Sequence, residues 1–170
     1  FRIMVTSLCN YSCFFCHKEG NTYKSNKSNN LDANDYGFLY DVGNRVFGYK
    51  TISITGGEPL IRKDISHIVK KLHDLGAEIT MTSNFYNYDM VENKQILGKT
   101  LNKLNISLHS MESGVNSKII RKNIDLERTI KNIESFANEN PNVNMGINYT
   151  LTKYNSSLEN IIQAIEFAKK

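Results

Sequence analysis

Short β-branched runs alternate with longer amphipathic stretches along this chain, and the alternation is the feature that most constrains its fold. The run 51–54 is followed by apolar residues at helical spacing over about 64–75, and the same pattern recurs. Strands that alternate with helices build a parallel sheet with right-handed crossovers. The predicted strands are 1–6, 51–54, 78–82, 103–108 and 144–151. The predicted helices are 32–48, 64–75, 88–97, 125–137 and one that starts near Ser157.

Cysteine, glycine and polar residues follow the predicted strands at their carboxyl ends. An open doubly wound sheet gathers its ligand at one switch point, whereas a (β/α) barrel spreads its site around one rim. We therefore predict an α/β fold, a parallel (β/α) partial TIM barrel with about five βα units, truncated before the sixth strand. We expect residues 1–170 to form one incomplete domain, with a further region beyond its C-terminal end.

The only three cysteines, Cys9, Cys13 and Cys16, stand in one CxxxCxxC loop after the first predicted strand. Thiolate is the soft ligand that iron–sulfur clusters select, and three thiolates leave one iron of a four-iron cluster without a protein ligand. The odd count argues against a disulfide framework and favours a reducing, cytoplasmic compartment. Zinc is an alternative because His17 follows Cys16, although adjacent residues would have difficulty reaching one ion together.

Composition excludes few other classes of protein. The 170 residues are 40% hydrophobic, with a formal net charge of +4, so the chain can bury a core and is only mildly basic. It has no basic stripe with interleaved aromatic residues, and no apolar run approaches the roughly 20 residues that cross a bilayer. We expect neither nucleic-acid nor membrane binding. The polar stretch 21–30 has little apolar surface to bury and is expected to be mobile.

A second chemical signal lies in the turn Thr55-Gly56-Gly57-Glu58-Pro59, after the second predicted strand. Two glycines at a strand end are most often only a turn that needs permissive backbone angles. They also let a ligand approach the backbone, and Glu58 offers a carboxylate that could hold an ammonium group. Combined with the cysteine loop one strand earlier, the turn becomes strong evidence for a binding site.

The two motifs together resemble the radical S-adenosylmethionine (SAM) superfamily. Nearly the whole chain is similar to its GTP 3′,8-cyclase branch, which serves molybdenum-cofactor biosynthesis, through the stretches 2–6, 55–64, 82–84, 105–110 and 147–150. The resemblance implies a [4Fe–4S] cluster whose open iron is chelated by SAM. It also implies a lyase in which a flavodoxin or ferredoxin donor reduces the cluster. SAM is then cleaved to methionine and a 5′-deoxyadenosyl radical, which takes a hydrogen atom from the substrate.

The resemblance further assigns roles to individual residues. Phe15 would contact SAM through its backbone, Gly57 and Glu58 would receive the amino end, and Ser107 would lie near the carboxylate or ribose. Arg2 and Thr82 match positions that contact GTP, although Thr82 could equally be a hydroxyl that caps the strand end. The implied SAM-binding residues are Phe15, Gly56, Gly57, Glu58, Ser83, Asn84 and Ser107, and the implied cluster ligands are Cys9, Cys13 and Cys16.

Departures from the cyclase pattern concern mainly the substrate. Ser53 and Gly146 stand where the cyclase carries an arginine and a lysine, which are natural ligands of a triphosphate. A radical SAM maturase that modifies a peptide is therefore an alternative, and a non-catalytic iron–sulfur or zinc module is an alternative of another class. Phe85 replaces a usual glycine, and His109 stands where an acidic residue is more common. We interpret His109 as a hydrogen-bonded structural histidine at the rim.

Overall fold

The computed structural model describes residues 1–16 and 31–169. The expected mobile stretch 21–30 and the possible zinc ligand His17 lie outside the described residues. The strands are β1 (Arg2–Met4), β2 (Thr51–Thr55), β3 (Glu78–Ser83), β4 (Lys103–Ser107) and β5 (Asn144–Asn148). The helices are α1 (Ala33–Phe47), η1 (Pro59–Ile61), α2 (Ile65–Asp74), η2 (Tyr88–Met90), α3 (Gln95–Thr100), α4 (Ser113–Ile120), α5 (Leu126–Glu139) and α6 (Leu158–Ala168).

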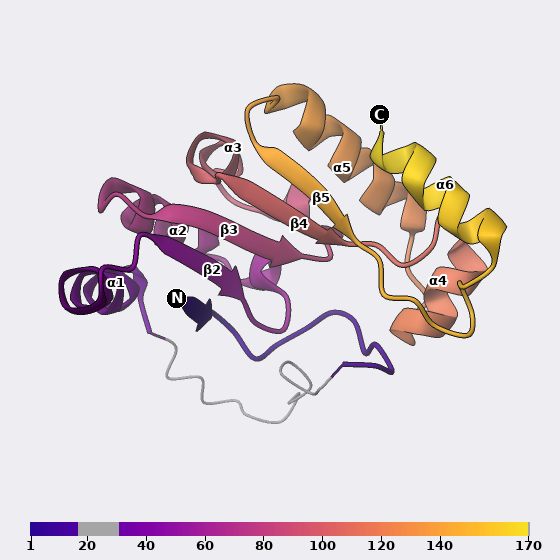
Figure 1. Cartoon of the computed structure of the whole chain (residues 1–170), viewed down its shortest axis with the longest axis horizontal. Coiled ribbons are helices and arrows are strands. Elements are labelled where there is room, and N and C mark those ends of the chain that lie inside the picture. The colour runs from indigo at the N-terminus through magenta and orange to yellow at the C-terminus, as the bar shows by residue number, and fades with distance from the viewer. Residues whose placement is uncertain (17–30, 170) are drawn as a thin grey trace.

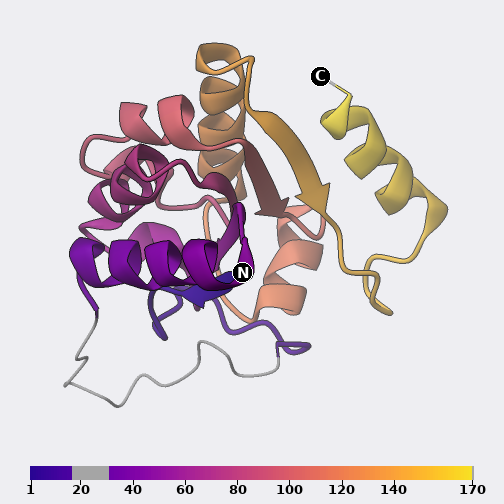
Figure 2. The same ribbon diagram turned by 60° about the vertical axis from the view of Figure 1, so that its left-hand side comes forward.

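The five strands form one parallel sheet in the order β1-β2-β3-β4-β5. Helices α1, α2, α3 and α5 lie on one face of this sheet, as Figures 1 and 2 show. The strand order never reverses, so the sheet has no switch point of the doubly wound kind. This arrangement confirms the predicted partial barrel, with a curved open sheet and one uncovered face.

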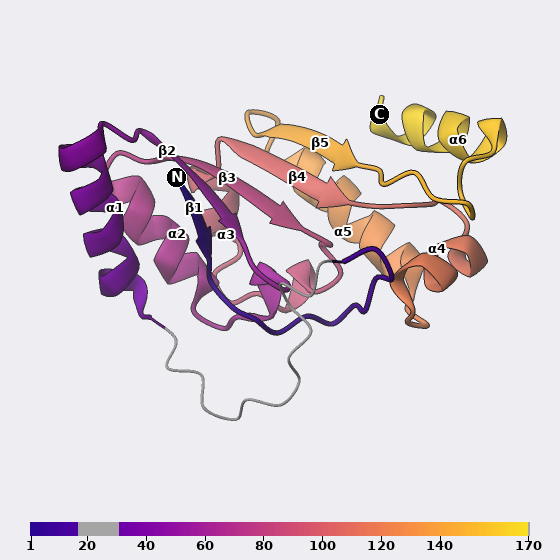
Figure 3. The same ribbon diagram turned by 60° about the horizontal axis from the view of Figure 1, so that its bottom comes forward.

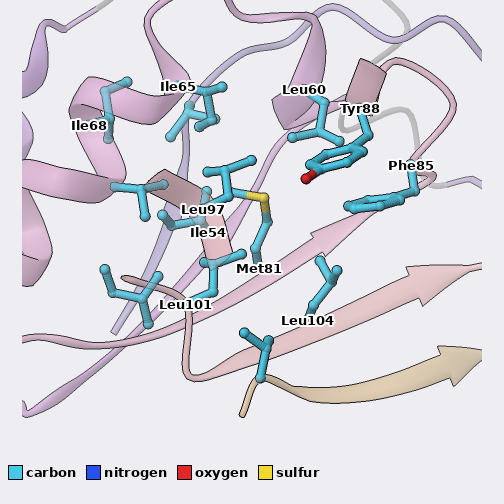
Figure 4. Packing of buried hydrophobic residues seen from close by; sticks show 14 of the residues in the cluster. Ile54, Leu60, Ile65, Ile68, Met81, Phe85, Tyr88, Leu97, Leu101 and Leu104 are labelled. Atoms are coloured by element: carbon cyan, nitrogen blue, oxygen red, sulfur yellow. The ribbon is translucent and has the colours of Figure 1, made fainter. Parts of the chain in front are cut away.

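The core lies between the sheet and its helices. Alternate strand residues such as Ile54, Met81 and Leu104 are fully buried, because successive side chains of a strand point to opposite faces. They belong to one buried cluster with Ile65 and Ile68 of α2, and Figure 4 shows Ile54 and Met81 between that helix and Leu104. The residues between them face the uncovered side of the sheet and are polar or glycine, among them Ser53, Thr80, Thr82, Asn105 and Gly146.

Several predicted elements are confirmed together with their end signals. Asp32 caps α1 by accepting from the N–H groups of Asn34 and Asp35, and Gly48 ends it in the left-handed conformation with φ of 70°. Ser157 caps α6 in the same way, through the N–H group of Asn160. Strands β1 and β5 are shorter than predicted, because ladder pairing stops at Met4 and Asn148.

The helix predicted over 88–97 is wrong. The chain there forms the single turn η2, then an extended residue, Val91, and a left-handed Asn93 with φ of 54°, before α3 begins at Gln95. Asparagine tolerates this conformation better than most residues, so the apolar spacing across 88–97 does not reflect one continuous helix. Helix α4 was missed, because its short sequence, interrupted by Gly114, carries no clear apolar stripe.

Helix α6 forms as predicted, but its apolar stripe is only partly covered. Leu158 is 73% exposed, Ile165 is 49% exposed and Ile162 is 43% exposed. Figure 2 shows α6 set apart from the sheet, beyond the strand β5. No helix in residues 1–16 or 31–169 is long and apolar enough to span a membrane.

Arg62 is a buried cation that joins three segments near the start of α2. Its Nη1 donates to the carbonyl of Val5 and its Nη2 to the carbonyl of Leu31, both at 2.6 Å. Its Nε and Nη2 also form a paired contact with Asp64 at 2.6 and 2.9 Å. The hydrogen bonds from Arg62 lower the pKa of Asp64. The guanidinium thereby fixes the chain after β1 against the entry to α1.

We expect Arg62→Lys to lower the free energy of unfolding by about 1–3 kcal/mol, measured by urea denaturation. Lysine keeps the charge but lacks the planar fork, so the carbonyls of Val5 and Leu31 cannot both keep a donor. Arg45→Lys is the matched control, because Arg45 is 77% exposed and pairs with Asp41 only one helical turn away. A loss no larger than that of the control would contradict the role given to Arg62.

Candidate functional site

A cavity of about 460 Å³ opens at the carboxyl ends of the strands. This volume suits a small molecule, and the position is the one that active sites occupy in (β/α) barrels. All the predicted cluster ligands and SAM-binding residues line it, together with Thr82. Residues to which no binding role was assigned also line it, among them Tyr11, Asn148, Tyr149 and Thr150. Arg2 does not line the cavity. It is the exposed first residue of β1 and pairs in register with Ser53.

The cysteine loop is held on one side by the backbone of the glycine turn. The N–H of Gly57 donates to the carbonyl of Thr6, and the N–H of Glu58 to the carbonyl of Leu8, both at 2.8 Å. The two backbones are so close that a Cβ on Gly57 would lie 2.0 Å from the Leu8 oxygen, and one on Gly56 would lie 2.5 Å from the Thr6 oxygen. Glycine is therefore required here by the approach of the cysteine loop itself.

On its other side the cysteine loop is held by the helix that sequence reasoning missed. The N–H of Ser12 donates to the carbonyl of Ile120 at 2.9 Å, and the N–H of Phe14 to that of Ile119 at 3.2 Å. The last carbonyls of a helix have no partner within it, and here the loop supplies their donors. Figure 3 shows the segment after β1 running past the strand ends to the end of α4.

A side-chain contact from Asn10 joins the cysteine loop to the end of β3. Asn10 accepts from Nδ2 of Asn84 at 2.7 Å and donates to Oδ1 of Asn87 at 3.0 Å. Oδ1 of Asn84 also accepts from the N–H of Tyr86. The side chain of Asn84 therefore supports the cysteine loop as well as lining the cavity.

Phe85 follows Asn84 in a left-handed conformation, with φ of 61°. Residues other than glycine adopt this conformation at an energetic cost. The fully buried ring of Phe85 stacks on Tyr88 with centroids 4.6 Å apart and meets Phe136 edge-on at 5.4 Å. This packing offsets the backbone cost and explains how phenylalanine occupies a position where glycine was expected.

Glu58 is a carboxylate that lies almost entirely inside the protein, with 1% exposure. Oε1 accepts from the N–H of Leu60 at 2.9 Å and from the hydroxyl of Ser83 at 2.6 Å, and Oε2 accepts from the N–H of Asn84 at 2.7 Å. Burial raises the pKa of Glu58, and these three donors act against the shift. A carboxylate accepts about four hydrogen bonds, so Oε2 keeps room for a donor from the cavity.

The three cysteines of the loop line the same cavity. Burial raises the pKa of Cys9 to about 11 and of Cys13 to about 12, and charge on neighbouring cysteines adds to both shifts. Across the described residues, no three His, Cys, Asp or Glu side chains gather closely enough to share one metal ion. A cubane cluster needs no such grouping, because each thiolate binds a different iron. A set of three soft donors in one fixed loop fits such a cluster.

His109 faces the cavity beyond the end of β4. It is 3% exposed, its Nδ1 accepts from the N–H of Thr150 at 3.2 Å, and its ring meets that of Phe15 edge-on at 5.0 Å. Burial lowers the pKa of His109 to about 4, so the ring is neutral at physiological pH. The interpretation of a hydrogen-bonded histidine at the rim agrees with these contacts.

With this geometry established, the chain can be compared with known proteins. It matches the model of the Radical SAM superfamily over residues 3–169. It is 33% identical over 172 residues to the "Probable GTP 3′,8-cyclase" of Sulfolobus acidocaldarius, covering 98% of this chain and 51% of the relative. It is 34% identical over 170 residues to the protein of the same name from Sulfurisphaera tokodaii, covering 97% and 51%. The chain thus spans about half the length of these curated relatives.

Solved structures share the fold at lower sequence identity. Streptococcus suis SuiB bound to S-adenosylmethionine superposes with a TM-score of 0.78 and 24% identity, covering 98% of this chain and 36% of that chain. SuiB bound to the precursor peptide SuiA superposes with a TM-score of 0.76 and 24% identity, covering 98% of this chain and 35% of that chain. A radical SAM methyltransferase from Sphaerobacter thermophilus superposes with a TM-score of 0.68 and 19% identity, covering 98% of this chain and 52% of that chain. At these identities the likeness concerns the fold alone.

We expect Gly57→Ala to displace the cysteine loop and abolish stable cluster loading, because the added Cβ would meet the backbone oxygen of Leu8. The measurement is iron and sulfide content after anaerobic reconstitution. Gly114→Ala is the matched control, since a Cβ there meets nothing within 4 Å and alanine favours the helix α4. Normal loading of the Gly57→Ala variant would show that the close approach does not matter.

We expect His109 to make stability depend on pH. Its pKa is about 4 in the folded chain and near 6.5 when unfolded, so the unfolded chain binds more protons between these values. The stability from the neutral ring is complete above pH 6.5 and is lost as the pH falls. Between pH 7 and pH 4.5 the loss should reach about 2–3 kcal/mol by urea denaturation. If His109→Asn lost the same free energy of unfolding between pH 7 and pH 4.5, the pH dependence would come from other groups.

Proposed function

The chain belongs to the radical SAM superfamily, and we propose that its cavity holds a [4Fe–4S] cluster on Cys9, Cys13 and Cys16 with SAM at the remaining iron. The observation that carries this proposal is the joint placement of three thiols and the carboxylate of Glu58 on one cavity. Both are held by the same backbone contact, in which Gly57 and Glu58 donate to the cysteine loop. Two chemically different anchors are thereby fixed relative to each other.

Each side chain then has a defined task. Cys9, Cys13 and Cys16 would hold the cluster, which when reduced would supply the one electron that cleaves the C5′–S bond of SAM to methionine and a 5′-deoxyadenosyl radical. Oε2 of Glu58 would accept a hydrogen bond from the SAM ammonium, and Gly56 and Gly57, which line the cavity beside it, would meet the methionine part. Ser107 offers a hydroxyl at the end of β4. The roles of Phe15, Ser83, Asn84 and Thr82 follow from their positions around the same cavity.

We propose further that the reaction is of the GTP 3′,8-cyclase kind, a lyase reaction on a nucleotide that serves molybdenum-cofactor biosynthesis. The support is the name of the curated relatives, "Probable GTP 3′,8-cyclase", and the sequence identity of 33–34% over nearly the whole chain. A flavodoxin or ferredoxin would supply the electron. The chain spans about half the length of those relatives. The proposed substrate therefore rests on less of the protein than the proposed cofactor site does.

A peptide substrate is the second candidate, and the uncovered face of the sheet favours it. Neither Ser53 nor Gly146 supplies a positive charge on this face. The described strands place only two cations there, Arg2 and Lys103 at the register of Ser53, whereas a triphosphate requires several. A Cβ on Gly146 would meet only Oδ1 of Asn105, at 3.7 Å, so the fold has room for a side chain that the sequence does not use. The solved structure of SuiB with its precursor peptide has the same fold.

The test is anaerobic reconstitution with iron and sulfide, followed by dithionite and SAM. We expect 5′-deoxyadenosine and methionine in equal amounts from the wild-type chain, and none from Cys13→Ser. Ser12→Ala is the control within the same loop, because it removes a hydroxyl and no thiol. A fully loaded wild-type cluster that forms no 5′-deoxyadenosine would identify a non-catalytic iron–sulfur module instead. Added GTP should accelerate the cleavage if the substrate is a nucleotide and leave it unchanged if it is a peptide.

A further inference from the structure

The hydrogen-bond state of His109 is fixed by its contacts. The partner of Nδ1 is the backbone N–H of Thr150, which can only donate, so Nδ1 must carry its lone pair. In the neutral ring the proton therefore sits on Nε2. Among the described residues nothing accepts a hydrogen bond from Nε2, although the ring lines the cavity. His109 thus presents one unused donor, of fixed identity, to whatever the cavity holds.

The ring is also held in place by the buried side chain of Asn155. Nδ2 of Asn155 donates to the carbonyl of His109 at 2.7 Å and to that of Thr150 at 3.0 Å. Its Oδ1 accepts from the N–H and the hydroxyl of Thr152 at 2.7 and 2.8 Å. Asn155 is completely buried, so both partners of the imidazole contact are clamped from behind. A donor fixed in this way binds an acceptor without losing further conformational freedom.

The two ends of the cavity differ in chemistry. Glu58 is the only carboxylate among the described lining residues and follows β2, whereas His109 follows β4. Two strand spacings separate these positions, roughly 10 Å. SAM carries an ammonium at its methionine end, while the ring nitrogens and ribose oxygens at its adenosine end are acceptors. With the ammonium at Glu58, the adenosine end extends toward His109.

We propose that Nε2–H of His109 donates a hydrogen bond to the adenosine end of SAM and makes His109 a cofactor-binding residue. The inference rests on the proposed function, since it takes SAM as the occupant of the cavity. A neutral donor also suits this cofactor because it does not repel the sulfonium charge. The edge-on contact with Phe15 places the ring of His109 against the cysteine loop. The residue that binds SAM would therefore contact the loop that holds the cluster.

The test compares two substitutions in the reconstituted chain. His109→Asn keeps an acceptor for the N–H of Thr150 but loses the donor at the Nε2 position, whereas His109→Gln carries an amide N–H that reaches this position. We expect the dissociation constant of SAM, measured anaerobically by equilibrium dialysis, to rise about tenfold in His109→Asn. His109→Gln should recover much of the affinity. The exposed His67 supplies the control variant His67→Asn, which should bind SAM as the wild type does.

Competition with the two halves of the cofactor locates the contact. 5′-Deoxyadenosine should displace SAM about tenfold less well from His109→Asn relative to the wild type, and methionine equally well from both. SAM binding within twofold of the wild type, in a variant that unfolds at the wild-type temperature, would overturn the inference. A loss that falls equally on methionine would also overturn it. If the wild-type chain with a full cluster binds no SAM, the proposed function itself fails, which is a distinct result.

Discussion

The site depends on one close backbone approach, between the cysteine loop and the glycine turn after β2. Two hydrogen bonds of 2.8 Å join these segments, and the 2.0 Å left for a Cβ at Gly57 allows no side chain between them. The same turn places Glu58 inside the protein, where Ser83, Asn84 and Leu60 supply its donors. A single constraint of the backbone thus sets the thiols and the carboxylate at a fixed separation, before any cofactor is present.

Around this contact, the polar groups of the site hold one another in position. Asn10 connects the cysteine loop to β3, the carbonyls at the end of α4 hold its backbone, and Asn155 joins the loops after β4 and β5. Each of these groups has a partner, so burying it costs little. Rigid support of this kind lets binding free energy go into the cofactor contact, because the loops need no reordering.

The sequence predicts the parts of this structure that follow from local chemistry. These parts depend on residues near one another in the chain. They are the two ends of α1, at Asp32 and Gly48, the five strands, and the position of the site at the rim. The sequence does not predict α4, because its eight residues carry no clear apolar stripe and its last carbonyls are paired with the cysteine loop more than a hundred residues away. The roles of Asn10 and Asn155 are not predicted either, because each looks like an ordinary polar loop residue in the sequence and its partners lie far away or in another loop.

The contrast between the cavity and the uncovered sheet face bears on how substrate choice arises in this fold. In the cavity, Glu58 and the cysteine loop are held by hydrogen bonds to backbone groups, so a change there disturbs the loops. Ser53 and Gly146 lie on the sheet face, where a side chain can change without affecting the cysteine loop, as the free space at Gly146 shows. A changed side chain at Ser53 or Gly146 can therefore leave Glu58 and the thiols in their present geometry.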